Sequence, residues 1–443
     1  MQNTKSNAYV LQVETELRCE IPESGIFTVM LMEGSAELFG IELAPSKEYI
    51  FSDKNVAIFT WYGCKLQTTV TENISIIYVS DSTPMLSYVN THIQLEAKRD
   101  AALANHECGP RVLVCGPSDS GKSTTARILT AYACRLDRTP LYIDLDVGQS
   151  SITLPGAIGA TATNKFNMSV EDGFIYSAPL LYSLAHNTPR EYGEVYNKIV
   201  SVLADKVNER MKRDVDVRAS GFVINTCGYI DDDGYDILLK CIKSFSIDVV
   251  LVMGHDRLYS SLSSSLKDST TIVKLPQSGG VVRRERQYRY RTGQSKIRDY
   301  FYGNRNVNSA SGSGKVAYSP ARVDVQISSF VIIKAGGLQL SENMRVMGDS
   351  EIDATELVRV APNKQELEGY ILSILYADPN CNDTATAGND EVPQSLSEAN
   401  VAGFVCIKSI DIDQDKMTLL VPNGSTELPS KYLLLGSIKW EDK

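Results

Sequence analysis

Residues 116–123 read Gly-Pro-Ser-Asp-Ser-Gly-Lys-Ser, a complete G-x-x-x-x-G-K-[ST] phosphate loop. The apolar run Val112–Cys115 precedes this loop, and the amphipathic stretch Thr124–Leu136 follows it. The context matters because the motif works at the junction between a strand and a helix. The sequence therefore predicts a strand, a phosphate-binding loop and a helix in succession, and a nucleoside triphosphate as the ligand of the loop.

Four residues of the loop have separate roles in binding a triphosphate. Gly116 and Gly121 let the backbone turn so that successive N–H groups point at an anion, and the start of the helix adds the positive end of its dipole. Lys122 is expected to reach the β- and γ-phosphates, and the Ser123 hydroxyl to ligate Mg²⁺.

Length and composition limit the class of protein. A chain of 443 residues is expected to form two or three domains. The start of the chain lacks the apolar core of a secretory signal, and no stretch of about eighteen consecutive apolar residues predicts a membrane span. The nine cysteines are scattered without a C-x-x-C pair, which is typical of reduced thiols in a cytosolic or nuclear protein. No cysteine pair has a histidine at the spacing of a structural zinc site.

A net charge of −10 argues against binding of polyanions by the whole surface, so any nucleic-acid contact must come from a local patch. One stretch qualifies, with the basic residues Arg283, Arg284, Arg286, Arg289, Arg291, Lys296 and Arg298. A solvated basic helix face is the simplest interpretation of such a stretch. Its position after a phosphate-loop region favours a phosphate-facing role, in which an arginine stabilises charge on a transferring phosphoryl group.

The first part of the chain, residues 1–83, is predicted to be an antiparallel β-sandwich or barrel. Short alternating runs separated by turn signals carry this prediction, and they fall at Tyr9–Leu11, Ile26–Leu31, Ala36–Phe39, Tyr49–Phe51, Val56–Trp61 and Ile74–Val79. Residues 84–108 contain an amphipathic stretch, Pro84–Asn105, which predicts a helical connector.

Residues 109–303 alternate between apolar strand-like runs and helical patterns. The expected strands are Val112–Cys115, Leu141–Leu145, Phe222–Asn225, Val249–Met253 and Thr271–Leu275. Such alternation predicts a parallel sheet covered on both faces, with the nucleotide at the carboxyl ends of the strands.

Residues 304–443 are predicted to form a smaller, mostly-β C-terminal domain. Its start, Asn304–Lys315, has the composition of a flexible linker, and strand-like runs follow. One apolar-periodic stretch, Gln365–Tyr376, predicts a helix. Asn380–Asn400 is polar and is expected to be a mobile loop.

Two aspartates follow the strand that comes after the phosphate loop. Asp146 lies where ligands bind in such sheets, so it is expected to hold the magnesium shell or to take the proton from an attacking hydroxyl. Asp144 is expected to be a solvated or strand-edge carboxylate. Asn225 stands where many phosphate-loop enzymes have an aspartate, which argues against a motor-type ATPase because an amide cannot act as a base. Gln277–Gly280 is expected to be a loop turn.

Read together, the motifs resemble the polyribonucleotide 5′-hydroxyl kinases that are subunits of the pre-mRNA cleavage and polyadenylation machinery. The stretches that carry the resemblance are Thr15–Arg18, Glu37–Leu43, Phe59–Trp61, Ser82–Leu86, Gly109–Val112, Gly116–Thr124, Asp146–Gln149, Leu154–Gly156, Ile224–Gly228, Lys274–Val281 and Tyr300–Gly303. The resemblance covers residues 9–440 and is weakest after residue 303.

The resemblance implies ATP and Mg²⁺ as ligands and a nuclear protein. It implies an adenine site at Glu16 and Lys54, of which the second matches with a shift in spacing. The phosphates would be held by Gly116 and by Asp119, Ser120, Gly121, Lys122, Ser123 and Thr124. Ser123 and Asp146 would hold the metal, Lys122, Asp146 and Arg289 would catalyse transfer, and Gln149, Tyr229 and Arg284 would contact RNA. Implied partners are RNA 5′ ends, other subunits of the cleavage factor and the tRNA splicing endonuclease, with no membrane.

Three departures from the family pattern bear on activity. Tyr229 stands where the family has tryptophan, which keeps an aromatic face for base stacking. Of the two lid arginines, Arg289 is in register, whereas Gly293 holds the second position and Arg291 lies two residues earlier. The segments 304–316 and 385–399 also differ.

Three functions remain open from the sequence. The first is an active kinase that converts ATP and a 5′-hydroxyl RNA into ADP and a 5′-phosphorylated RNA. The second is a scaffold for 3′-end formation whose domains are locked together by ATP, which the altered lid favours. The third is a phosphate-loop ATPase of unrelated purpose, and this third function does not explain the collinear motifs.

Overall fold

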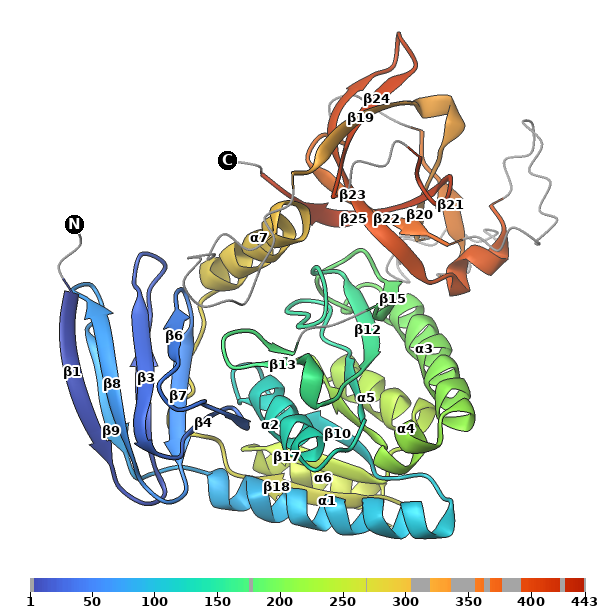
Figure 1. The fold of residues 1–443 in the computed structure, drawn as a ribbon. Helices are drawn as coiled ribbons and strands as arrows, with labels where there is room; N and C mark the ends of the chain where they lie inside the picture. The colour runs from blue at the N-terminus through green and yellow to red at the C-terminus, as the bar shows by residue number, and fades with distance from the viewer. Residues whose placement is uncertain are drawn as a thin grey trace.

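The computed structural model describes residues 4–174, 178–267, 269–303, 319–335, 355–361, 367–376, 392–422 and 427–441. The chain forms an N-terminal β-sandwich, a central α/β part and a mostly-β C-terminal part, in that order (Figure 1). This arrangement confirms the fold class predicted from the sequence.

The N-terminal sandwich consists of two antiparallel sheets. The first has four strands in the order β1 (Thr4–Leu11), β8 (Cys64–Thr71), β3 (Phe27–Gly34) and β6 (Glu48–Phe51). The second has five, in the order β5 (Ile41–Glu42), β4 (Glu37–Leu38), β7 (Asn55–Thr60), β2 (Thr15–Glu20) and β9 (Ile76–Ser80). The predicted runs omit strands β2 and β8, although both alternate between apolar and polar residues. Leu17 and Cys19 lie between charged residues in β2, and Cys64, Leu66 and Val70 lie between polar residues in β8.

Helix α1 (Met85–Asn105) occupies the stretch predicted to be helical and leads from the sandwich along the central part (Figure 1). Its buried residues, among them Tyr88, Leu95 and Ala102, recur at helical spacing and form one face. Met85, Tyr88 and Leu95 lie in the same hydrophobic core cluster as side chains of the central sheet and Phe59 of the sandwich, so the helix packs against both parts.

The central sheet has seven strands in the order β15 (Leu180–Ser183), β12 (Ala157–Ala162), β11 (Leu141–Asp144), β16 (Phe222–Asn225), β10 (Arg111–Cys115), β17 (Val249–Met253) and β18 (Thr271–Leu275). The strands from β11 to β18 are parallel, as predicted. At one edge, β12 pairs antiparallel with β11, and β15 pairs antiparallel with β12. The sequence did not predict β12, because it is built from small residues such as Gly159 and Ala160.

Helices cover both faces of this sheet. Alternate residues of β10 show the division: Val112 and Val114 pack with α1 and α2 (Lys122–Arg135), whereas Leu113 and Cys115 pack on the other side. The helices of that other side are α3 (Gly193–Arg213), α4 (Val215–Ser220), α5 (Asp233–Ser244) and α6 (Asp256–Ser265). A short hairpin of β13 (Met168–Ser169) and β14 (Gly173–Phe174) follows the turn η1 (Lys165–Asn167).

The C-terminal part is a seven-stranded sheet. Its order is β19 (Ala321–Gln326), β24 (Lys416–Val421), β23 (Val401–Asp411), β22 (Tyr370–Leu375), β25 (Tyr432–Lys439), β20 (Val331–Ala335) and β21 (Leu357–Arg359). The turns η2 (Ile327–Ser329) and η4 (Gln394–Glu398) also belong to this part.

The helix expected at Gln365–Tyr376 is wrong where the structure describes it, because β22 occupies that stretch. Residues 371–375 are buried on both faces, and a continuous apolar run does not distinguish a buried strand from a helix. The predicted linker at 304–315 lies outside the described residues, as does most of the loop predicted at 380–400.

Helix α7 (Arg286–Tyr302) connects the site region to the C-terminal sheet. The Phe301 ring stacks on Trp440 with 5.3 Å between ring centroids, and the Tyr300 hydroxyl accepts a 3.0 Å hydrogen bond from the backbone N–H of Phe404. In the described residues, no helix is long and apolar enough to cross a membrane.

Candidate active site

The phosphate loop lies between β10 and α2, as predicted. Gly116 and Gly121 have φ values of 149° and 89°, in the region that favours glycine, and a Cβ at Gly116 would lie only 2.9 Å from the carbonyl oxygen of Met253. Asp119 has a φ of 56°, which is uncommon for a residue with a side chain. Helix α2 begins at Lys122, so the free N–H groups of its first turn face the loop.

Lys122 and Ser120 of the loop are buried, and their polar side-chain atoms have few hydrogen-bond partners in the protein. Lys122 is only 6% exposed, and its Nζ donates a 2.7 Å hydrogen bond to the carbonyl oxygen of Pro117. Burial lowers the pKa of Lys122, and the negative charge of Asp146 opposes this effect. The buried Ser120 Oγ has no hydrogen-bond partner among the described residues, which leaves a polar atom for a ligand.

A chain of hydrogen bonds leads from the loop to the neighbouring strands. Ser123 Oγ donates to Asn225 Oδ1 at 3.1 Å, and Asn225 Nδ2 donates to Asp144 Oδ1 at 2.9 Å. Asp144 is fully buried and also accepts hydrogen bonds from Ser151. The expectation of a solvated Asp144 is therefore wrong, because β11 lies inside the sheet between β12 and β16 and its end is covered.

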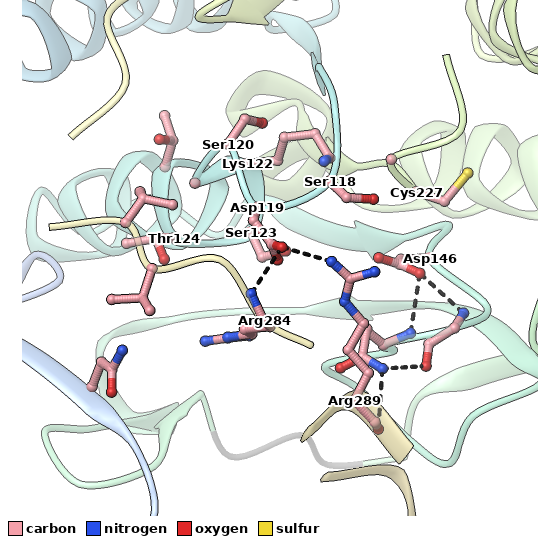
Figure 2. Close-up of a pocket in the computed structure, with 18 of the residues that line it drawn as sticks. Ser118, Asp119, Ser120, Lys122, Ser123, Thr124, Asp146, Cys227, Arg284 and Arg289 are labelled. Carbon is pink, nitrogen blue, oxygen red and sulfur yellow. Dashed lines mark hydrogen bonds and ion pairs between the residues drawn. The ribbon is translucent and has the colours of Figure 1, made fainter. Parts of the chain in front are cut away.

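Asp146 follows β11 by two residues and lies in the same cavity as the phosphate loop (Figure 2). Its Oδ1 accepts hydrogen bonds from the backbone N–H groups of Gly148 and Gln149, both at 3.0 Å. Burial raises the pKa of Asp146, as does the charge of Asp144, while these N–H groups and Lys122 lower it. A carboxylate with a raised pKa in a fixed orientation is suited to take up a proton.

The lid, defined here as residues 283–302, reaches over the phosphate loop. Arg289 forms an ion pair with Asp119, with 2.6 Å between Nη2 and Oδ2, and the backbone N–H of Arg284 donates to the same oxygen at 3.1 Å. Figure 2 shows the Arg289 guanidinium between Asp119 and Asp146. Gln149 Nε2 donates to the backbone carbonyl oxygen of Arg289 at 3.5 Å.

The basic stretch is thus only partly a solvated helix face. Lys296 Nζ donates to the carbonyl oxygens of Gln149 (3.2 Å) and Ser150, and burial lowers its pKa. Arg291 instead pairs at 3.2 Å with Glu23 of the sandwich, and both side chains are largely exposed. Gly293 lines the cavity without a side chain.

A cavity of about 960 Å³ joins these groups. Its walls come from the sandwich, the phosphate loop, residues 145–150 after β11 (the Asp146 loop), the lid and strand β25 of the C-terminal sheet. The predicted RNA contacts Gln149, Tyr229 and Arg284 all line it. So does Arg190, whose guanidinium carbon lies 5.1 Å from the centroid of the Tyr229 ring, an arginine that the sequence analysis did not identify.

The two predicted adenine-site residues differ in position. Glu16 lines the cavity, is 4% exposed and accepts a 2.5 Å hydrogen bond from Arg18 Nε. Lys54 is not among the lining residues, and its Nζ donates to the carbonyl oxygen of Glu171. Arg18, Tyr78 and Asn55 line the cavity instead. Arg18 could have been identified from the sequence, because residues two apart in a strand share a face with Glu16.

Three family models cover most of the chain. "N-terminal beta-sandwich domain of polyadenylation factor" matches residues 10–102, "mRNA cleavage and polyadenylation factor CLP1 P-loop" matches 116–303, and "Pre-mRNA cleavage complex II protein Clp1" matches 318–442. The chain belongs to the Clp1 family.

Curated relatives of this Clp1-family chain extend over nearly its whole length. Polyribonucleotide 5′-hydroxyl-kinase Clp1 of Homo sapiens is 38% identical over 436 residues, which covers 98% of this chain and 96% of that protein. The protein of the same name from Danio rerio is 37% identical over 434 residues, with 98% and 93% covered. Both of these relatives are therefore named as kinases.

The Clp1 fold is also present in solved structures. The structure of a wild-type Clp1p–Pcf11p complex contains a chain that matches with a TM-score of 0.82 at 24% identity and covers 100% of both chains. A second structure, titled for an extended interface between Pcf11p and Clp1p and for ATP loss in a point mutant, has the same TM-score and covers 98% of this chain. At 24% sequence identity, this structural similarity establishes the fold of the chain.

Proposed function

We propose that this chain is an ATP-dependent RNA 5′-hydroxyl kinase and the ATP-binding subunit of the pre-mRNA 3′-end cleavage and polyadenylation machinery. The observation that carries the proposal is the meeting of Lys122, Ser123, Asp146 and Arg289 in one cavity, although these residues come from three separate segments. The names of the curated relatives support the same reaction.

The residues present fit ATP and Mg²⁺. The unpaired Ser120 Oγ, the glycine turns and the buried Lys122 ammonium form a cradle for phosphates, and Glu16 lies at the sandwich end of the same cavity, where the base would bind. The Ser123 hydroxyl and the Asp146 carboxylate are the groups that would hold Mg²⁺. When bound, this ion neutralises charge on the phosphate oxygens.

The RNA end would enter beside Tyr229. Arginine planes and tyrosine rings both stack on unpaired bases, so Arg190 and Tyr229 together offer a platform for the first base, and Gln149 and Arg284 would contact the sugar–phosphate backbone. This compensates for the smaller ring of tyrosine at the position where the family has tryptophan.

In the proposed step, Asp146 accepts the proton of the RNA 5′-hydroxyl. The 5′ oxygen forms a bond to the γ-phosphorus while the bond between that phosphorus and the bridging oxygen of ADP breaks. Lys122 and Arg289 stabilise the charge on the transferring group, and the lid excludes water. The products are ADP and a 5′-phosphorylated RNA, with the proton on Asp146.

A second candidate is a catalytically silent scaffold in which ATP locks the domains. Gly293 in the lid favours it, because it removes one of the two arginines expected there. The cavity is lined by all three parts of the chain, so ATP would stabilise their docking, by about 2.7 kcal/mol at a concentration a hundredfold above the dissociation constant.

We also propose a nuclear location, with other subunits of the cleavage factor and the tRNA splicing endonuclease as partners. The names of the family models and the solved complexes of Clp1p with Pcf11p support the first of these partners.

The test is transfer of labelled γ-phosphate to a 5′-hydroxyl oligoribonucleotide, with a DNA oligonucleotide beside it. Lys122→Ala should abolish transfer, and Lys65→Ala, which removes an exposed ion pair of the sandwich, should leave it unchanged. Tight ATP retention without transfer by the unmutated protein would favour the scaffold. ATP hydrolysis that does not depend on RNA would favour an unrelated ATPase.

A further inference from the structure

We infer that Asp119 is a positioning residue for transfer: its carboxylate holds the Arg289 guanidinium over the phosphate loop, ready for the transferring phosphoryl group. This role deepens the proposed kinase function and rests on it. Asp119 acts through Arg289 and through the start of the lid, 170 residues away in the sequence, and not by contact with the reacting atoms.

A carboxylate in a loop that binds phosphates requires a reason, because its charge opposes the ligand. At Asp119 that carboxylate is directed to the lid. One oxygen accepts hydrogen bonds from both Arg289 Nη2 and the backbone N–H of Arg284, and the Asp119 carbonyl oxygen accepts one from Gln277 Nε2 at 3.2 Å. The loop residue thus contacts the chain before, at the start of and within the lid.

The ion pair between Asp119 and Arg289 is partly shielded from solvent. The Asp119 side chain is 16% exposed and that of Arg289 is 36% exposed, so the attraction is screened less than in the fully exposed pairs of the surface. The other end of Arg289 is fixed as well, because its backbone carbonyl oxygen accepts from Gln149. A long side chain with many rotamers is therefore ordered before the reaction.

The pair with Asp119 also leaves N–H donors of Arg289 available for the transferring phosphoryl group. A guanidinium has five N–H donors, and the pair with Asp119 uses the one on Nη2 that faces the loop. Figure 2 places the group between the loop and Asp146, where a phosphoryl group would pass from ATP to the RNA hydroxyl. With Gly293 at the second arginine position, the orientation of Arg289 matters more in this chain.

The direction in which Asp119→Asn changes kcat distinguishes a positioning role of Asp119 from an inhibitory one. If Asp119 positions Arg289, then Asp119→Asn lowers kcat, because the guanidinium loses its fixed orientation. The same change lowers the KM for ATP, because a negative charge beside the triphosphate is removed. If Asp119 instead held Arg289 away from the reaction, Asp119→Asn would raise kcat.

The experiment measures kcat and KM for ATP with a 5′-hydroxyl oligoribonucleotide in excess. Asp119→Asn should lower kcat by about tenfold to a hundredfold, the range expected for small misplacements of catalytic groups, while the KM for ATP falls. The matched control is Glu23→Gln, which breaks the exposed ion pair of Arg291 in the same lid and should change neither constant.

A double-mutant cycle tests the route of action. Arg289→Ala should lower kcat more than Asp119→Asn does, and adding Asp119→Asn to Arg289→Ala should lower kcat no further. Additive losses, an unchanged kcat in Asp119→Asn or a raised kcat would each overturn the inference while the kinase function stands. An unmutated protein that transfers no phosphate would instead overturn the proposed function, and the inference with it.

Discussion

At the scale of single residues, Asp146 shows how the fold tunes a catalytic group. Two backbone N–H groups hold one of its oxygens, which fixes the orientation of the carboxylate. Burial and the charge of Asp144 raise its pKa, so the charged form costs folding free energy at neutral pH. The environment that suits Asp146 to accept a proton therefore also lowers the stability of the folded protein.

We predict that Asp146→Asn strongly slows transfer and stabilises the fold. Loss of the base should lower kcat by about 10²–10⁴. The folded-state pKa lies above the unfolded value, so the carboxylate destabilises the protein at pH values above the unfolded pKa, and the neutral amide removes this cost. Transfer assays and thermal midpoints at pH 7 measure both effects, and a lowered midpoint contradicts the prediction.

The element that decides the site is helix α7. Its first turns contact the phosphate loop through Arg289, its middle contacts the Asp146 loop through Lys296, and its end packs on the C-terminal sheet through Phe301. The lid is thus fixed at three places, two in the central part and one in the C-terminal sheet, and its arginine depends on packing far from the phosphates.

We predict that Phe301→Ala weakens both stability and transfer. Phe301 is fully buried against Trp440, and removal of such a ring costs about 3–5 kcal/mol. Urea unfolding should show that loss, and kcat should fall because the end of the lid is released. Ser295→Ala, at an exposed position of the same helix, is the control and should leave both unchanged. Normal kcat in a destabilised Phe301→Ala protein would show that the lid does not need this anchor.

At the scale of the whole molecule, the central and C-terminal parts meet at a buried histidine. His186 is 5% exposed, stacks on Tyr192 and shares a 3.0 Å hydrogen bond between Nδ1 and Ser437 Oγ of β25. Burial lowers its pKa to about 4, helped by the charge of Lys334. The junction therefore requires a neutral imidazole.

We predict that acid weakens this junction. Because the folded-state pKa of His186 is depressed, its contribution to stability is complete above the unfolded pKa of 6.5 and is lost as the pH falls toward about 4. The loss is at most about 3 kcal/mol. His186→Asn, which keeps a hydrogen-bonding side chain but does not titrate, should reduce the fall in urea midpoint between pH 7 and pH 5. An equal fall in both proteins would exclude His186 as the cause.

The sequence alone determined the phosphate loop, the class of each of the three parts, and the roles expected of Lys122 and Ser123. These follow from local rules, because the turn glycines, the start of a helix and the alternation of strands depend on neighbouring residues. The residues of the Asp146 loop were also identified, since strand ends in a parallel sheet meet at one edge.

Only the tertiary structure decided which side chains meet. It buried Asp144 at the end of an interior strand, directed Lys54 to Glu171 and away from the cavity, and made the 370–375 run a strand. It also brought Asp119 to Arg289 and Arg190 to Tyr229. Such contacts join segments distant in sequence, and packing of whole elements sets them, so no local pattern of residues contains them.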